Sequence, residues 1–237
     1  MVFRTLLLFA TTTALAADLG KPIQLFNGRN LDGFDRFLQT KGLNSDPESV
    51  LQVRDGVICI SGKEYGYLIT RQEYENYSLR AEFKWGEKTW PPREGRARDS
   101  GILFHVGGPD KVWPVSIEFQ IIEGGTGDII LVGDTTSLTR AGESKTRGRF
   151  NRYGKNPVAG GSPTLAGYRD PVAEYEKLHG EWNLLELFAD GDSVKYVVNG
   201  KVANEGAGAN RVRGKILFQS EGAEVFFRNL ELRPLKK

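Results

Sequence analysis

The sequence has very little of several residue types on which common functional sites depend. Its 237 residues include one cysteine, one methionine and two histidines. The single Cys59 excludes a disulfide framework within the chain and a cysteine-rich metal site, and two histidines leave little room for a histidine-rich one. The formal net charge is only +2, from 32 basic and 30 acidic side chains, so composition gives no argument for a nucleic-acid or acidic-membrane partner.

Long apolar runs are also missing, except near the N-terminus. Residues 5–16, TLLLFATTTALA, follow Arg4 and end in Ala-Leu-Ala, the pattern of a signal peptide cleaved before Ala17. This run is shorter than the ~20 apolar residues that span a bilayer. We therefore predict a signal peptide at residues 1–16 and a single domain at residues 17–237. The product is expected to be exported, either periplasmic or secreted, with no membrane span after signal removal.

The rest of the chain is rich in glycine and in short alternating apolar segments. Residues 77–85, YSLRAEFKW, place an apolar side chain at every second position, which is typical of a half-buried strand. Val198-Asn199-Gly200-Lys201 is a hairpin-turn signal. Such patterns predict about ten strands and no amphipathic helix, and hence an all-β sandwich of two antiparallel sheets. The expected strands are residues 23–26, 57–60, 77–85, 101–106, 115–123, 129–132, 182–189, 194–198, 215–219 and 224–232.

Two segments interrupt the regular spacing of strands. Residues 87–98, EKTWPPREGRAR, form a loop rich in proline and arginine. Residues 134–180 show little strand pattern and carry a local excess of arginine. Long insertions in a compact domain are usually either functional or disordered, and the aromatic and glycine content of this one favours an ordered loop.

The strand at residues 115–123, VSIEFQIIE, carries polar side chains on one face. Glu118 and Gln120 lie two positions apart and therefore share that face, opposite the apolar side chains between them. A solvated sheet face would also explain this arrangement. Few other polar residues fall on this strand, which favours a functional face.

The preceding strand brings a histidine into the same region of sequence. In Asp99-Ser100-Gly101-Ile102-Leu103-Phe104-His105, Leu103 and His105 share a face, so His105 is expected near Glu118 if the two strands pair. A histidine beside a carboxylate is a workable general acid or base. The alternative is a structural histidine bonded to the backbone. Asp99 either caps the loop or holds a substrate hydroxyl.

Polar residues on later strands extend the candidate site. Glu181 and Asn183 share one strand face, as do Gln219 and Glu221 on another, and Asp128 follows a glycine cluster where it serves as a ligand or a turn residue. Carboxylates, amides and nearby aromatic rings are the groups that a sugar site uses. One polar concavity is therefore predicted from Glu118, Gln120, Glu181, Asn183, Gln219 and Glu221.

Several motifs occur in a fixed order along the chain: DSGILFH, EFQIIE, GEWN, VNG and KILFQSEGAEVFFRN. With the opening LFNGRNLDGF, this ordered set resembles the 3-keto-disaccharide hydrolase domain family over roughly residues 22–235. The resemblance implies a concanavalin A-like β-sandwich, or jelly roll. It also implies an enzyme that cleaves 3-keto-glycosides, produced by an upstream sugar 3-oxidoreductase as the pathway partner.

The implied chemistry sets clear requirements on the site. A ketone at C3 acidifies the C2 proton, so a base can remove it and the C1 substituent can leave by elimination, after which water adds back. Such a site needs a base, an acid for the leaving oxygen and groups that stabilise the oxyanion. A divalent cation would serve the last role. Hydrolysis by a pair of carboxylates is the competing route.

The shared strand faces and the family motifs together suggest roles for individual residues. Glu118 is the expected base or metal ligand, His105 its acid-base partner and Glu221 a second catalytic carboxylate; Arg98 or an arginine of residues 134–180 would stabilise the oxyanion. The expected substrate-binding residues are Asp99, Trp113, Gln120, Glu123, Asp128, Glu181, Asn183 and Gln219. The family pattern often has a histidine where this chain has Tyr196, a departure that bears on substrate or activity.

A non-catalytic carbohydrate-binding module on the same fold is the alternative function, because a fold hosts many functions. A plain structural or interaction domain is a third and weaker option. The sequence does not identify the sugar, the aglycone, the metal dependence, the oligomeric state or the role of the basic segment at residues 134–180.

Overall fold

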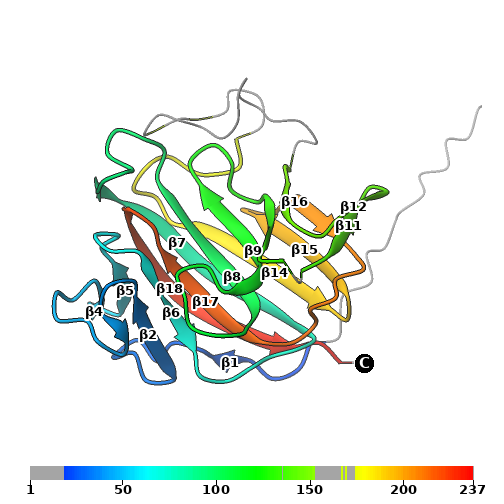
Figure 1. The fold of residues 1–237 in the computed structure, drawn as a ribbon, viewed down its shortest axis with the longest axis horizontal. Helices are drawn as coiled ribbons and strands as arrows, with labels where there is room; N and C mark the ends of the chain where they lie inside the picture. Colours follow the sequence, from blue (N-terminus) through cyan, green and yellow to red (C-terminus); the bar gives the residue numbers. More distant parts are fainter. Residues whose placement is uncertain (1–18, 135, 153–166, 168, 170–173, 237) are drawn as a thin grey trace, which may run out of the picture.

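The chain folds as a sandwich of two large antiparallel sheets. The computed structural model describes residues 19–134, 136–152, 167, 169 and 174–236. The predicted signal peptide, residues 1–16, and much of the 134–180 segment lie outside the described residues. All regular structure in the described part is β, and the two sheets face each other across a shared core (Figure 1). No helix long and apolar enough to cross a membrane occurs among these residues.

The first sheet has the strand order β16-β15-β14-β7-β18-β5-β4, with β1 pairing on β18. Its longest members, β7 and β18, lie side by side at the centre. The strands are β1 (Ile23–Gln24), β4 (Leu51–Arg54), β5 (Val57–Ile60), β7 (Tyr77–Thr89), β14 (Asn183–Asp190), β15 (Ser193–Val198), β16 (Lys201–Gly206) and β18 (Ala223–Pro234).

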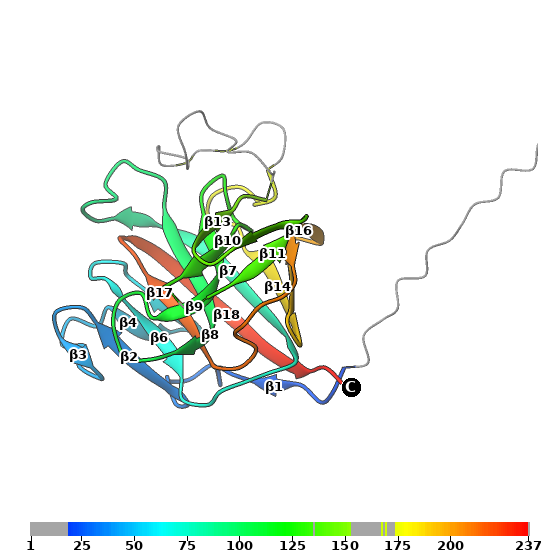
Figure 2. The same cartoon turned by 45° about the vertical axis from the view of Figure 1, so that its right-hand side comes forward.

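The second sheet has the order β13-β10-β9-β8-β17-β6-β2-β3. Figure 2 shows β10 and β13 at one end of this sheet and β2 and β3 at the other. The strands are β2 (Phe34–Leu38), β3 (Gly42–Leu43), β6 (Gly66–Thr70), β8 (Asp99–Gly107), β9 (Val115–Ile122), β10 (Ile129–Val132), β13 (Gly148–Phe150) and β17 (Lys215–Ser220). A separate hairpin consists of β11 (Leu138–Arg140) and β12 (Glu143–Lys145).

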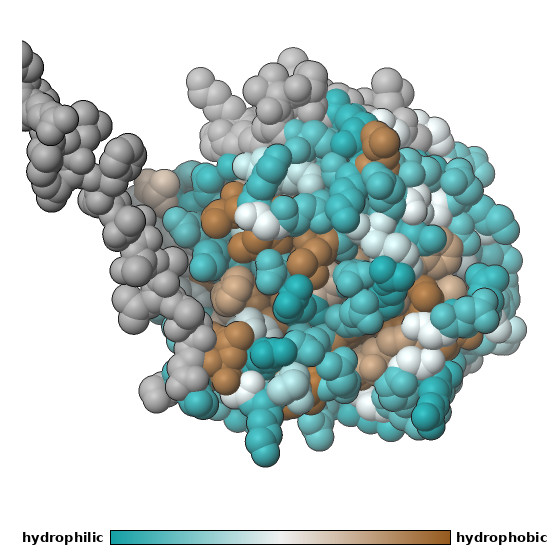
Figure 3. Space-filling model, turned by 180° about the vertical axis from the view of Figure 1, so that it is seen from behind, coloured by the Kyte–Doolittle hydropathy of each residue, from teal (hydrophilic) through white to brown (hydrophobic). Residues whose placement is uncertain are grey.

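Alternation along the strands creates the core, as the sequence predicts for β7. Its side chains Tyr77, Leu79, Ala81, Phe83 and Trp85 are all buried in the main hydrophobic cluster. Arg80 and the other intervening residues point to the opposite face of the sheet. The side of the molecule opposite to that in Figure 1 exposes both hydrophilic and hydrophobic residues (Figure 3).

Aromatic contacts join the two sheets beneath strands β9 and β17. The ring of Tyr196, from β15, stacks on Phe119 of β9 with ring centroids 4.1 Å apart. The Tyr196 hydroxyl donates a 3.1 Å hydrogen bond to the backbone carbonyl of Glu118. Phe218 of β17 packs on Phe227 of β18 at 5.2 Å. The strands that carry the outward-facing polar residues are therefore anchored from inside the core.

All ten predicted strand segments contain a strand, and the Asn199-Gly200 turn between β15 and β16 has the expected positive φ at both residues. Residues 134–180, which show little strand pattern in the sequence, hold three short strands in their described part, β11, β12 and β13, each of three residues. Strands β2, β3, β4, β6 and β16 have no counterpart among the ten. Cys59 is buried with a free thiol, as its apolar surroundings in sequence indicate.

Candidate active site

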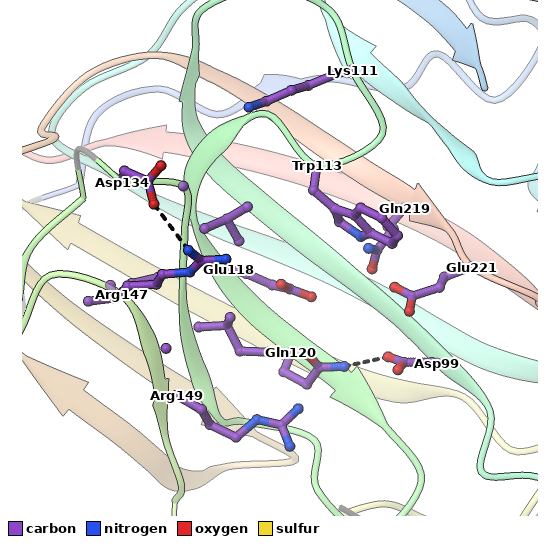
Figure 4. Close-up of a pocket in the computed structure, with 15 residues that line it drawn as sticks. Asp99, Lys111, Trp113, Glu118, Gln120, Asp134, Arg147, Arg149, Gln219 and Glu221 are labelled. Atoms are coloured by element: carbon purple, nitrogen blue, oxygen red, sulfur yellow. Dashed lines mark hydrogen bonds and ion pairs between the residues drawn. The ribbon is translucent and has the colours of Figure 1, made fainter.

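A cavity of about 560 Å³ opens on the outer face of the second sheet (Figure 4). Its floor comes from β8, β9 and β17, and its walls come from β10, β13 and the loop between β8 and β9. The volume falls within the ~300–1,000 Å³ range of small-molecule sites. The lining residues that carry polar or aromatic side chains are Asp99, Lys111, Trp113, Glu118, Gln120, Asp134, Arg147, Arg149, Gln219 and Glu221.

Strand register places the acidic floor of this cavity. In the β8–β9 pair Gly101 lies opposite Gln120 and Leu103 opposite Glu118, so both polar side chains leave the sheet on the face away from the core. Asp99 shares that face two residues before Gly101 and accepts a hydrogen bond from the Gln120 side-chain amide. The prediction that Glu118 and Gln120 lie side by side on one face is confirmed, and the structure brings Asp99 to them.

Two of the four carboxylates that line the cavity share one cation. A single nitrogen, Nη2 of Arg93, contacts Asp99 and lies 2.6 Å from a Glu221 carboxylate oxygen. Arg93 belongs to the proline- and arginine-rich loop at residues 87–98, which is attached to the β17–β18 turn by a 2.8 Å bond from the Trp90 amide to the Gly222 carbonyl. Sequence reasoning missed Arg93, because nothing local relates this loop to β8 and β17.

Glu118, unlike Asp99 and Glu221, is left without such a partner. Its side chain is buried, with 4% exposed, yet no residue in the described part of the chain hydrogen-bonds or ion-pairs with its carboxylate. Burial, and after it the charges of Glu221 and Asp99, raise the pKa of Glu118 well above its ordinary value, and Arg149 opposes them. A buried carboxylate with a raised pKa in a cavity is a candidate proton-transfer group.

Gly101 provides the space that the Glu118 carboxylate occupies. A methyl group at Gly101 would lie under 3.0 Å from Glu118 Oε1 and 3.1 Å from Gln219 Oε1. Gln219 is 1% exposed, and its Oε1 has no hydrogen-bond partner among the described residues. Two acceptor oxygens therefore converge above one glycine without a protein donor, which is the arrangement that a ligand hydroxyl would complete.

The rim of the cavity is aromatic and basic. Trp113 is 43% exposed and packs edge to face on Tyr65, with ring centroids 5.7 Å apart. Lys111, Arg147 and Arg149 contribute positive charge from the β8–β9 loop and from the region of β13. The structure places Trp113 in the cavity lining, together with Arg147 and Arg149 from residues 134–180, the segment expected to supply an arginine. Lys111 and the Tyr65 contact were not anticipated.

The expected proximity of His105 to Glu118 is wrong. The backbone of His105 has a φ of +51°, and the β8–β9 register shifts between Phe104 and Gly107, which is the signature of a β-bulge. The bulge turns the His105 ring inward, where it packs on Tyr77 and Phe104 at centroid distances of 5.8 and 5.0 Å.

His105 is also held by backbone bonds. Its Nδ1 bonds the Arg211 carbonyl at 2.8 Å, and Arg211 Nε donates to the His105 carbonyl at 2.9 Å. Burial lowers the pKa of His105 to about 4. His105 is therefore a structural histidine bonded to the backbone, which was the alternative to an acid-base role.

Glu123 and Asp128 also lie outside the cavity lining. Arg98 forms a buried ion pair with Glu123, with Nη1 2.8 Å from Oε1, and its backbone amide bonds the second oxygen at 2.8 Å. Asp128 accepts a 2.7 Å bond from the Arg152 amide and lies 3.5 Å from Arg149 Nε. Both carboxylates hold loops together, and Arg98, engaged with Glu123, does not reach the cavity.

Glu181 and Asn183 belong to a different part of the molecule. Glu181 accepts a 2.9 Å bond from the Leu178 amide in the turn before β14. Asn183 begins β14 in the first sheet, and its side-chain oxygen accepts bonds from the Lys177 amide at 2.7 Å and from Asn199 at 2.8 Å. Their predicted place in the polar concavity is wrong, because sharing a strand face says nothing about which sheet the strand joins.

No group of three or more His, Cys, Asp or Glu arranged to hold a metal ion occurs in the described ranges of the chain. A divalent cation that stabilises the oxyanion therefore remains a prediction. The site as described consists of Glu118 and Gln219 above Gly101, the Asp99–Arg93–Glu221 cluster with Gln120, the aromatic rim and the three rim cations.

Comparisons with known proteins agree with this fold. Two crystal structures from Parabacteroides distasonis ATCC 8503, each provisionally assigned as a glycosyl hydrolase, align with TM-scores of 0.58 and 0.56 at 21% and 20% identity. The alignments cover 91% of this chain in both cases, and 94% and 100% of those chains. Porphyranase B from Zobellia galactanivorans aligns at a TM-score of 0.51 and 9% identity, covering 86% of this chain and 87% of that one. No curated protein matches the sequence significantly.

These likenesses establish a concanavalin A-like sandwich as the fold, and they do not carry function at such identities. The family assignment comes from the sequence itself. The model of the 3-keto-alpha-glucoside-1,2-lyase-like domain matches residues 21–233, which is nearly all of the chain after the predicted signal peptide. The chain therefore belongs to the 3-keto-alpha-glucoside-1,2-lyase-like domain family.

Proposed function

We propose that this protein cleaves glycosides whose sugar carries a ketone at C3, and that Glu118 begins the reaction by removing the C2 proton. The observation that carries the proposal is the buried Glu118 carboxylate, which faces a cavity without a partner among the described residues. Its raised pKa makes it a stronger base than a solvated glutamate, although a smaller fraction is ionised at a given pH.

The proposed reaction proceeds by elimination. Glu118 takes the C2 proton, and the electrons of the C2–H bond form an enolate with the C3 ketone. The enolate then expels the C1 oxygen substituent, which forms a C1–C2 double bond conjugated with the ketone. The proton on Glu118 passes to the departing oxygen. Addition of water across the double bond gives the 3-keto sugar, so release before or after this addition determines whether the net reaction is that of a lyase or a hydrolase.

The surrounding residues support this use of Glu118. Arg93 balances Asp99 and Glu221 with one cation, so those carboxylates are fixed while Glu118 is not. Arg149 lowers the pKa of both Glu118 and Asp99 through its positive charge. The same charge would stabilise the negative enolate oxygen that forms beside Glu118. Gln120, bonded to Asp99, and the unpartnered oxygen of Gln219 would position sugar hydroxyls.

A substrate of this kind must come from a reaction that oxidises C3 of a glycoside, so an oxidoreductase that acts on intact glycosides would work upstream. We further propose that the protein acts after export to the periplasm or the medium, on the strength of the signal-peptide pattern at residues 1–16.

The test is release of a chromogenic aglycone. Purified mature protein would be incubated with 4-nitrophenyl 3-keto-glucosides of both anomers, with and without a chelator. We expect release by the wild type and a loss of at least about 100-fold in kcat/KM for Glu118→Gln, which keeps the shape but removes the base. We also expect exchange of the C2 proton with deuterated solvent when the leaving group is poor.

Two results would count against the proposal. Tight binding of unoxidised glucosides together with no release would identify a carbohydrate-binding module instead. Unchanged turnover in Glu118→Gln, with the fold intact by circular dichroism, would remove Glu118 from the mechanism. Glu181→Gln is the matched control, because that glutamate lies in a turn outside the cavity lining and its loss should leave kcat/KM unchanged.

A further inference from the structure

Three cations line the cavity that holds Glu118, Asp99 and Glu221. Lys111 lies in the loop between β8 and β9, Arg147 immediately precedes β13, and Arg149 lies within it. We call Lys111, Arg147 and Arg149 the cationic rim. The two arginines come from the basic segment at residues 134–180, whose arginine excess neither the fold nor the proposed elimination fully explains.

The charges of Lys111 and Arg147 are available to a ligand. Arg147 pairs with Asp134 at 3.3 Å, but these side chains are 77% and 84% exposed, and ion pairs in such solvated positions are weak and exchangeable. In the part of the chain that the structure describes, no carboxylate lies within ion-pair distance of Lys111. Arg149 is more enclosed and lies 3.5 Å from Asp128, so it belongs to the inner part of the rim.

Positive and negative charges are unevenly distributed within the cavity. In Figure 4, Lys111 and Arg147 lie on one side, where Asp134 is the one labelled carboxylate; Asp99 and Glu221 lie on the other side, and Glu118 lies between them. An anionic group would be repelled at the carboxylate side and attracted at the rim. An acidic ligand would therefore bind in one orientation, with its neutral sugar over the carboxylates and its anion at the rim.

We propose that the preferred ligand is a glycoside whose leaving group carries an acidic substituent, such as a carboxylate, sulfate or phosphate. The substituent would bind Lys111 and Arg147, and Trp113 would pack against the leaving group between the two charged sides. This inference rests on the proposed function for its orientation, since it takes the sugar to lie at Glu118. It adds the chemical class of the aglycone.

The test is a comparison of matched glucosides that are not oxidised at C3 and so bind without being cleaved. Dissociation constants for phenyl, 4-carboxyphenyl and 4-sulfophenyl glucosides, in both anomers, would be measured by titration calorimetry with the mature wild-type protein. We expect the acidic ligands to bind about tenfold more tightly at low ionic strength, because one charge-assisted hydrogen bond contributes about that factor. The advantage should shrink in 0.5 M salt, because salt screens exposed charges. A benefit from only one of the two acids would identify which anion the rim fits.

Substitutions assign the effect to the rim. Lys111→Met combined with Arg147→Met should abolish the advantage, so that the acidic ligands bind this variant no more tightly than phenyl glucoside does. The control is Lys195→Met combined with Arg213→Met, which removes one lysine and one arginine whose side chains contact Phe188 and Glu73, away from the cavity. The control should keep the full advantage.

The outcomes separate this inference from the proposed function. Equal or weaker binding of the acidic ligands, with phenyl glucoside still bound and 3-keto-glucosides still cleaved, overturns the inference alone. An advantage that survives in the Lys111 and Arg147 double variant also overturns it. If no glucoside binds and no 3-keto-glucoside is cleaved, the proposed function fails and the inference fails with it.

Discussion

Replacement of Gly101 by alanine is the sharpest test of the site geometry. Gly101 lies on β8, beneath the side chains of Glu118 and Gln219, and its backbone is not in the left-handed region that excludes alanine. The substitution therefore adds a single methyl group at the floor of the cavity without straining the strand. Any effect on activity must come from what that methyl group displaces.

The expected magnitude follows from the contacts. The methyl carbon would lie under 3.0 Å from Glu118 Oε1, against a comfortable separation of about 3.5 Å, so the carboxylate must retreat by on the order of 1 Å. A displacement of about 1 Å at a catalytic group costs about 100-fold in rate. The carboxylate is the mobile end of a side chain that faces a cavity, so the loss of unfolding free energy should stay near the lower end of the ~1–3 kcal/mol seen for overpacking.

The assay compares kcat/KM on a 3-keto-aryl-glucoside with the thermal midpoint of unfolding. Gly86→Ala is the matched control, because it also drives a methyl group against a glutamate carboxylate, that of Glu224, outside the cavity lining. We expect Gly101→Ala to lose about 100-fold in kcat/KM and Gly86→Ala to lose stability alone. If a folded Gly101→Ala protein kept full activity, catalysis would not require the Glu118 carboxylate to lie over Gly101, which would refute the proposed site geometry.

Two further predictions concern residues outside the reacting centre. Burial raises the pKa of Glu176 to about 8, and its carboxyl bonds Trp85 and Thr126. Folding favours the protonated form of Glu176, so this carboxyl stabilises the fold fully when the pH is below the ordinary pKa of glutamate. The stabilisation declines as the pH rises toward 8. Glu176→Gln should therefore unfold at a higher temperature than the wild type at pH 9 and at a similar temperature at pH 5; a wild-type midpoint that rises between these values would contradict the assignment. His105→Asn, which tolerates the positive φ, should cost about 1–3 kcal/mol of stability through lost packing while kcat/KM stays within about threefold; a 100-fold loss of kcat/KM in a folded variant would restore His105 to the mechanism.

Period-two alternation predicted the parts of the site that depend on a single strand. Glu118 and Gln120 share a face because they are two residues apart on β9, and nothing beyond strand geometry is needed to place them together. The register of β8 against β9 then brings Asp99 to the same face. The sequence correctly paired Glu118 with Gln120 because that inference required only a local pattern, whereas the approach of Asp99 depends on the pairing of β8 with β9.

His105 shows where this reasoning fails. Continued alternation from Leu103 would place its side chain over the cavity, but the bulge after Phe104 inverts it. The bulge is stabilised by contacts distant in sequence: Arg211 bonds the ring and the carbonyl, and Gly214 packs on the His105 backbone where a side chain would collide. No local signal in the sequence reports a contact with residues a hundred positions away.

Sheet membership was the second limit on prediction. Asn183 alternates correctly within β14, yet β14 pairs with β7 and β15 in the first sheet, so its side chain meets Asn199 and not Glu118. Arg93 was missed for the related reason that its loop is joined to the β17–β18 turn only in three dimensions. Topology, rather than propensity, decides such placements.

The position of the Glu118 carboxylate depends on both faces of its strand. On the outer face Gly101 leaves the room, and on the inner face Tyr196 stacks on Phe119 and donates to the Glu118 carbonyl. Burial raises the pKa of Tyr196 far above its ordinary range, so this hydroxyl remains a donor at every pH at which the protein would act. Close packing transmits displacement, so a substitution in the core beneath β9 would move the carboxylate as a methyl group at Gly101 does. Tyr196 therefore supports the strand that carries Glu118 from the buried side of the sheet.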